Sequence, residues 1–210
     1  MTALIDKILE KIPYDTVTDT EVSALLKGTK ASRYNQLKRS LAKGELLHIR
    51  RGLYLLAKRY QRKPLNQYAL AQKIYTPSYI SFESALSYHG LIPEAVYTVS
   101  SASLKRSREF KTPVGVFAFT QIPQRVFYAG VDRIEKDWVV FLMARPSKAL
   151  ADYVFYHRSK WKKVGQFLKS LRIEPDSLKI DPDELQSILQ EYNSQYVTLL
   201  FKDLKKEFRL

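Results

Sequence analysis

The 210-residue sequence contains no cysteine, which excludes a disulfide framework and any metal site built on thiolates. Long apolar runs are missing as well, because the longest one, WVVFLMA at 138–144, is far too short to span a bilayer. The opening MTALIDKILEKI is interrupted by charged residues and lacks the apolar core of a signal peptide. We therefore expect a soluble, cytoplasmic protein.

Motifs for catalysis or cofactor binding are also lacking. The chain has no GxGxxG and no complete phosphate-binding loop. No paired spacing favours a metal at the three histidines, which are His48, His89 and His157. One acidic cluster is explained by a predicted helix start, where a cap and the helix dipole favour carboxylates: Asp181, Asp183 and Glu184. We predict a protein that is not an enzyme and that needs no cofactor or metal.

Negative charge is in short supply, with 35 Lys and Arg against 21 Asp and Glu. Residues 1–63 hold 14 basic and 6 acidic residues, so less than a third of the chain carries a surplus of 8. Such an imbalance favours a polyanionic partner, either nucleic acid or an anionic membrane. The surplus ends in the polar segment KRYQRKPLNQ, in which Pro64 suits the first turn of a new helix. We place a boundary there, between domains 1–63 and 64–210.

The first domain predicts three helices and a hairpin. Apolar residues recur at spacings of three and four over 2–12, 18–28 and 32–44. In the third helix, Tyr34, Leu37 and Leu41 form the expected buried face. The runs ELLHI and GLYLL then flank Arg50, Arg51 and Gly52, a short glycine-containing loop that indicates a hairpin. Two helices joined by a turn and followed by a basic hairpin are typical of a winged helix-turn-helix.

This interpretation assigns roles to polar residues of the third helix and the hairpin. The helix would enter the major groove and the hairpin would contact phosphate or the minor groove. The predicted base-reading residues are Ser32, Arg33, Asn35 and Gln36. The predicted phosphate-contacting residues are Lys30, Lys38, Arg39, Lys43, Arg50 and Arg51. A solvated basic face on an ordinary helical domain is the alternative, but the order of helix, turn, helix and hairpin favours double-stranded DNA.

The second domain predicts an α+β fold that ends in helices. Helices are expected at 64–75, at 81–90 with Ser81 as N-cap, and from Pro146, Ser159, Pro182 and Ser194. Strands are expected at 96–102, 114–122, 125–131 and 138–144. Basic residues mixed with aromatics predict a second, weaker basic surface: Lys105, Arg106, Arg108, Arg158, Lys160, Lys162 and Lys163. Core aromatics with solvated lysines are the alternative explanation of these segments.

Four blocks occur in order between about residues 44 and 155: GELLHIRRGLYLL, YISFESALSYHGLIPEAVYTVSSAS, FKTPVGVFAFTQIP and ARPSKALADYVF. Together they resemble the AbiEi antitoxin family of type IV toxin-antitoxin systems. The resemblance implies an N-terminal winged helix that binds inverted repeats in a promoter, with room for two copies on DNA, and represses its own operon. It also implies a C-terminal domain that counteracts a nucleotidyltransferase-like toxin without a stable complex. Ser147 departs from the family's usual Pro-Glu-Lys-Ala.

We therefore predict a DNA-binding autorepressor with antitoxin function. The alternative within the same fold is a stand-alone winged-helix regulator whose C-terminal domain binds a ligand or a protein. An enzyme acting on nucleic acid is the rival from a different class, and it would need clustered carboxylates to hold a metal.

Overall fold

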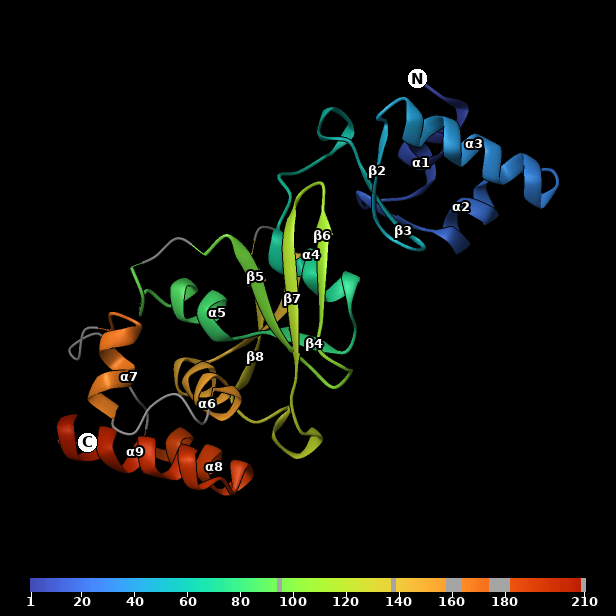
Figure 1. Ribbon diagram of the computed structural model, residues 1–210. Helices are drawn as coiled ribbons and strands as arrows, with labels where there is room; N and C mark the ends of the chain where they lie inside the picture. Colours follow the sequence, from blue (N-terminus) through green and yellow to red (C-terminus); the bar gives the residue numbers. More distant parts are fainter. Residues whose placement is uncertain (94–95, 137–138, 158–163, 174–181, 209–210) are drawn as a thin grey trace. The chain divides into compact units, whose positions relative to one another are not determined.

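The computed structural model describes residues 1–210 except 94–95, 137–138, 158–163, 174–181 and 209–210. The chain divides into two units (Figure 1). The first unit comprises Met1–Asn66 with Phe110–Gly115, and the second comprises Gln67–Glu109 with Val116–Leu210. Helices and strands are mixed along the chain, which confirms the predicted α+β class. Among the described residues, no helix combines the length and apolarity needed to cross a membrane.

Three helices of the first unit enclose an apolar core: α1 (Ala3–Lys11), α2 (Asp19–Leu25) and α3 (Lys30–Ala42). α1 buries Leu4, Ile5 and Ile8 at the spacing that its sequence predicts and ends before Pro13. α2 begins with a capping box, because the Thr18 hydroxyl accepts from the backbone N–H of Glu21 and the Glu21 carboxylate accepts from the backbone N–H of Thr18.

The third helix starts two residues earlier than predicted, because the Thr29 hydroxyl caps it by accepting from the backbone N–H of Ser32. Its buried path runs through half-buried Arg33, then Leu37 and Ser40, at spacings of four and three residues. This path leaves Tyr34 at its margin with 63% of its surface exposed. The prediction that Tyr34 packs inward is therefore wrong.

A three-stranded antiparallel sheet completes the first unit: β1 (Thr16–Thr18), β2 (Leu46–Arg50) and β3 (Leu53–Leu56), in the order β1-β3-β2. The predicted hairpin is confirmed as β2 and β3, with Gly52 at a φ of +76° in the turn. β1 was not predicted, because three residues between a proline and a helix cap are too few to show a strand pattern. The 3₁₀ turn η1 (Lys58–Tyr60) follows β3.

A mixed six-stranded sheet has the order β6-β7-β5-β4-β9-β8. All of its residues belong to the second unit except Phe110–Thr112 of β6 and Gly115 of β7. The strands are β4 (Ser78–Ile80), β5 (Thr98–Ser103), β6 (Arg108–Thr112), β7 (Gly115–Gln121), β8 (Val131–Lys136) and β9 (Val139–Ala144). β4 runs antiparallel to β5 and parallel to β9. β5, β7 and β9 were predicted, whereas β4, β6 and β8 were not. The strand predicted at 125–131 is wrong, because the 3₁₀ turn η2 (Gln124–Val126) begins there.

Six helices accompany this sheet in the described residues: α4 (Gln67–Ile74), α5 (Phe82–Tyr88), α6 (Pro146–Tyr156), α7 (Val164–Ser170), α8 (Pro182–Tyr192) and α9 (Gln195–Phe208). α6 contacts β9, α5, α8 and α9 (Figure 1). The predicted start of α4 at Pro64 is wrong, because that helix begins at Gln67. Ser81 is the N-cap of α5 as predicted, but its side chain makes no cap hydrogen bond. The predicted cap Asp181 lies outside the described residues.

Candidate nucleic-acid interface

The outer face of α3 is polar and basic. Ala31, Asn35, Lys38 and Ala42 follow one another at spacings of four, three and four, and all are exposed. Seven of the predicted DNA-contacting residues are exposed: Lys30, Ser32, Asn35, Lys38, Arg39, Lys43 and Arg51. The other three are partly buried: Arg33, Gln36 and Arg50. The fold therefore brings most of these side chains to the surface of one helix and one turn.

Arg33, which is predicted to read bases, instead bonds to a neighbouring helix. Its guanidinium donates to the carbonyl oxygen of Ser23 on α2 at 3.2 Å. Its Cα lies on the buried path of α3, four residues before Leu37. In this geometry Arg33 joins α3 to α2, and its charged group is not on the stripe through Asn35.

The turn between β2 and β3 is fixed to the start of α2. The backbone N–H of Asp19 donates to the carbonyl oxygen of Gly52 at 3.3 Å, and the Tyr54 hydroxyl donates to the Asp19 carboxylate at 2.8 Å. The Arg50 guanidinium donates to the carbonyl oxygen of Arg51 at 2.8 Å, which stiffens the turn from within. The hairpin is therefore held at both its turn and its second strand.

Tyr54 packs against a histidine of the neighbouring strand, because its ring centroid lies 5.7 Å from that of His48. Burial, the Asp19 carboxylate and, to a smaller extent, the Tyr34 side chain together raise the pKa of Tyr54 to about 12. Sequence reasoning did not single out Tyr54.

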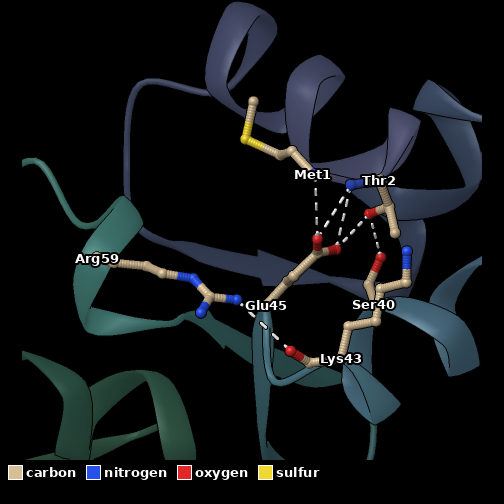
Figure 2. A network of polar contacts seen from close by, with 6 residues as sticks. All are labelled: Met1, Thr2, Ser40, Lys43, Glu45 and Arg59. Carbon is tan, nitrogen blue, oxygen red and sulfur yellow. Dashed lines mark hydrogen bonds and ion pairs between the residues drawn. The ribbon is translucent and has the colours of Figure 1, made fainter.

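Acidic residues are scarce in the segment that forms this surface, which leaves the surface strongly positive. Residues 26–63 hold 12 Lys and Arg but a single acid, Glu45. Glu45 is 3% exposed. Its carboxylate accepts from the backbone N–H of Thr2 at 3.1 Å and from the Thr2 hydroxyl at 2.6 Å, and it lies 3.9 Å from the Met1 ammonium (Figure 2). No carboxylate of this segment therefore faces the solvent beside the basic residues of α3 and the hairpin.

The same carboxylate also anchors α3 to α1. The Thr2 hydroxyl that donates to Glu45 also shares a 2.6 Å hydrogen bond with the buried hydroxyl of Ser40 on α3 (Figure 2). Nearby, the Arg59 guanidinium reaches the carbonyl oxygen of Lys43 at the end of α3. These contacts fix the helix that carries the candidate interface within its own unit.

The weaker basic surface is partly described. Lys105, Arg106 and Arg108 are exposed, and they lie between β5 and β6 or at the start of β6. The Lys105 ammonium lies 5.4 Å from the centre of the Tyr75 ring, whose hydroxyl donates to the carbonyl oxygen of Arg106. The remaining members of this prediction lie outside the described residues: Arg158, Lys160, Lys162 and Lys163.

Sequence reasoning missed a buried polar cluster in the second unit. The Lys148 ammonium lies 3.1 Å from the Asp152 carboxylate, one turn along α6, and both side chains are 0% exposed. Tyr79 and Ser81 donate to the same carboxylate at 2.8 and 2.6 Å. The Tyr192 hydroxyl of α8 accepts from Lys148 at 2.8 Å and donates to Asp152. A Lys and an Asp four residues apart in the otherwise apolar KALAD could have signalled this pair.

Burial shapes the titration of this cluster. It lowers the pKa of Lys148, although the Asp152 carboxylate opposes that effect. Burial and the Asp152 carboxylate together raise the pKa of Tyr79 and Tyr192 well above the ordinary value. Lys148 also donates to the carbonyl oxygen of Val126 in η2. The contacts of these groups hold α6, α8 and η2 together. Because solvent does not reach them, they offer no access to a substrate.

The histidines and carboxylates do not assemble a metal centre in the part of the chain that the structure describes, where no group of three or more could hold an ion. His89 instead contacts the carbonyl oxygen of Ala144 at 2.9 Å, and the ring of His157 packs 4.6 Å from that of Tyr153.

A scan against protein-family models and a search of curated proteins both find no match to this chain.

Proposed function

We propose that the first unit is a winged helix-turn-helix domain that binds double-stranded DNA. The order helix, strand, helix, helix, strand, strand and the sheet order β1-β3-β2 support this proposal. In it, α3 is the recognition helix that enters the major groove. The hairpin of β2 and β3 is the wing, and Arg51 at its turn contacts phosphate.

One observation carries this proposal. Residues 26–63, which include α3 and the hairpin, hold 12 basic residues, and their one acid, Glu45, is buried against the backbone N–H of Thr2 just before α1. A surface with this excess of positive charge attracts phosphate, and each neutralised phosphate releases a counterion. The Asp19 carboxylate of α2 lies beside the turn, where it accepts from the Tyr54 hydroxyl.

We further propose that the protein acts as an autorepressor and antitoxin of the AbiEi type, with two copies on promoter inverted repeats. Support comes from the blocks YISFESAL and RPSKALAD, which contribute Tyr79, Ser81, Lys148 and Asp152 to one buried cluster. Ser147, where that family usually has glutamate, is 1% exposed and its hydroxyl has no hydrogen-bond partner in the described chain. This departure therefore lies inside the second unit.

The experiment for DNA binding measures affinity by fluorescence anisotropy, with duplexes from the chain's own promoter region and scrambled duplexes of equal length. Lys38→Ala/Lys43→Ala removes two exposed charges from α3, and Lys11→Ala/Lys169→Ala removes two exposed charges elsewhere. We expect the α3 pair to weaken binding at least tenfold and to lower the salt slope by about two, because two phosphate contacts are lost. Equal effects from both pairs, or no binding to any duplex at low salt, would overturn the proposal.

The antitoxin role is tested by co-expression with a nucleotidyltransferase-like protein encoded beside the gene. We expect wild-type protein to restore growth, and we expect the Lys38→Ala/Lys43→Ala variant to restore it as well, because α3 serves DNA binding. Failure of both proteins to restore growth, with DNA binding intact, would leave a regulator without antitoxin activity.

A further inference from the structure

The outer face of α3 carries an amide and two methyl groups beside the ammonium group of Lys38. Asn35 lies on the exposed stripe, with Ala31 one turn before it and Ala42 two turns after it. Two alanines on this stripe leave room for the helix to approach the floor of a groove. Among the basic side chains of α3 that could suit guanine, Arg33 is partly buried and donates to Ser23 on α2 instead. The others are exposed, and we assign them to phosphate: Lys30, Lys38 and Arg39.

These groups match one pair of bases. An asparagine amide can donate to N7 and accept from N6 of adenine at the same time, and an alanine methyl group suits the C5 methyl group of thymine. Guanine is read mostly by arginine or lysine, which donate to O6 and N7. Ala31 and Asn35 lie about 6 Å apart along the helix axis, a distance that spans nearly two base-pair steps. Both side chains can therefore meet neighbouring base pairs.

We propose that α3 reads A·T base pairs in the major groove, with Asn35 pairing with an adenine and the methyl group of Ala31 contacting a nearby thymine. This inference rests on the proposed function, and it names the base composition at the centre of each binding site. Arg39 in the second half of α3 and Lys43 at its C-cap contact the phosphates at the groove edge. Arg33 keeps its contact with α2 in the complex.

The test begins with selection of tight-binding duplexes from a random library by the full-length protein. We expect enrichment of adjacent A·T pairs. The preferred duplex is then made with 7-deazaadenine, which lacks the N7 acceptor, and with uracil in place of thymine, which lacks the methyl group. Each change should weaken wild-type binding, by about tenfold for the adenine contact and less for the methyl contact.

Matched variants locate each contact on the protein. Asn35→Ala should be insensitive to 7-deazaadenine but still sensitive to uracil, and Ala31→Gly should show the reverse. Both positions are exposed, so circular dichroism should show unchanged folding. Arg33→Met should lower stability and leave the preference for A·T intact, because the guanidinium contacts Ser23.

Three outcomes would overturn this inference without touching DNA binding itself. They are selection of G·C pairs, an Asn35→Ala protein as sensitive to 7-deazaadenine as the wild type, and loss of base preference in Arg33→Met. Absence of binding to every duplex would instead overturn the proposed function, and this inference with it.

Discussion

Lys148 and Asp152 show how one pair of side chains can connect elements that are distant in the sequence. Gly130 makes room for them, because a Cβ atom at that position would lie 2.9 Å from the Cβ atom of Lys148. The charges of the pair are compensated by each other and by the hydroxyls of Tyr79 and Tyr192. A buried ion pair of this kind is costly to break on one side, because the remaining charge has lost both its partner and its water.

We therefore expect Lys148→Met to lower the free energy of unfolding by about 3–5 kcal/mol, since Asp152 is left buried and unpaired. The double variant Lys148→Met/Asp152→Leu should recover a large part of this loss, because it leaves no buried charge. Urea denaturation followed by circular dichroism measures both effects. Lys169→Met on the exposed side of α7 is the control and should change little. A double variant less stable than the single one would contradict this explanation.

Alkaline pH tests the buried phenols. Folding raises the pKa of Tyr54 to about 12 from 10.0, and it raises the pKa of Tyr79 and Tyr192 well above 10.0. Above pH 10 the folded state then holds protons that the unfolded state has lost, so stability is complete below that pH and falls as pH rises. We expect absorbance at about 295 nm to show exposed tyrosines titrating first, and these phenols only at higher pH or on unfolding. Simultaneous ionisation of all 14 tyrosines in the folded protein would be inconsistent with this burial.

For single residues, the sequence predicts which side chains are exposed better than it predicts their hydrogen-bond partners. Three of the basic residues of α3, Lys30, Lys38 and Arg39, are exposed, as solvation of charge requires, whereas Arg33 is partly buried. Tyr34 was misplaced because a helix has a continuous range of directions, and three residues before Leu37 is only near the buried face. The partner of Arg33 could not be predicted, because it depends on the angle at which α2 and α3 pack.

Among the elements, the hairpin depends most on one backbone conformation. Gly52 has a φ of +76°, and a Cβ atom there would lie 3.2 Å from the Asp19 carboxylate oxygen. Gly44 also has a positive φ, of +61°, but a Cβ atom there would meet nothing within 4 Å. Alanine substitutions at these two glycines therefore distinguish the cost of a positive φ from the cost of disturbing the contact between the turn and α2.

We expect Gly44→Ala to lower the free energy of unfolding by about 1 kcal/mol and Gly52→Ala to lower it by about 2 kcal/mol, because only the second also disturbs Asp19. Thermal and urea denaturation measure the difference. Gly52→Ala should also weaken DNA binding, since the turn that carries Arg51 is displaced. Equal stability losses, with equal DNA affinity, would argue against a role for the contact between the turn and α2.

Helices and central strands were predicted from apolar spacing more reliably than edge strands. β6 and β8 end the sheet and carry charged residues, so no apolar pattern marks them. The aromatic run after Arg125 looks like a strand by composition. Its Val126 and Phe127 are instead buried at and just after η2, where the carbonyl group of Val126 accepts from Lys148. Composition indicated burial there correctly but not backbone conformation.

For the whole molecule, the net charge of +14 makes ionic strength the most direct variable. About six phosphate contacts predict that the logarithm of the association constant falls with the logarithm of salt concentration with a slope near −5. Anisotropy titrations between about 50 and 200 mM salt measure this slope. A complex insensitive to salt would contradict an interface built from α3 and the hairpin.

The order of the chain gives the buried cluster a role during synthesis. Tyr192 is made 40 residues after Asp152, and after all strands of the sheet that the structure describes. Until α8 arrives, Lys148 and Asp152 lack one of their hydroxyl partners and that side of the second unit stays hydrated. The nascent chain therefore closes this part of its interior only after α8 is made, and a ribosome stalled before α8 would present an incomplete core to chaperones and proteases.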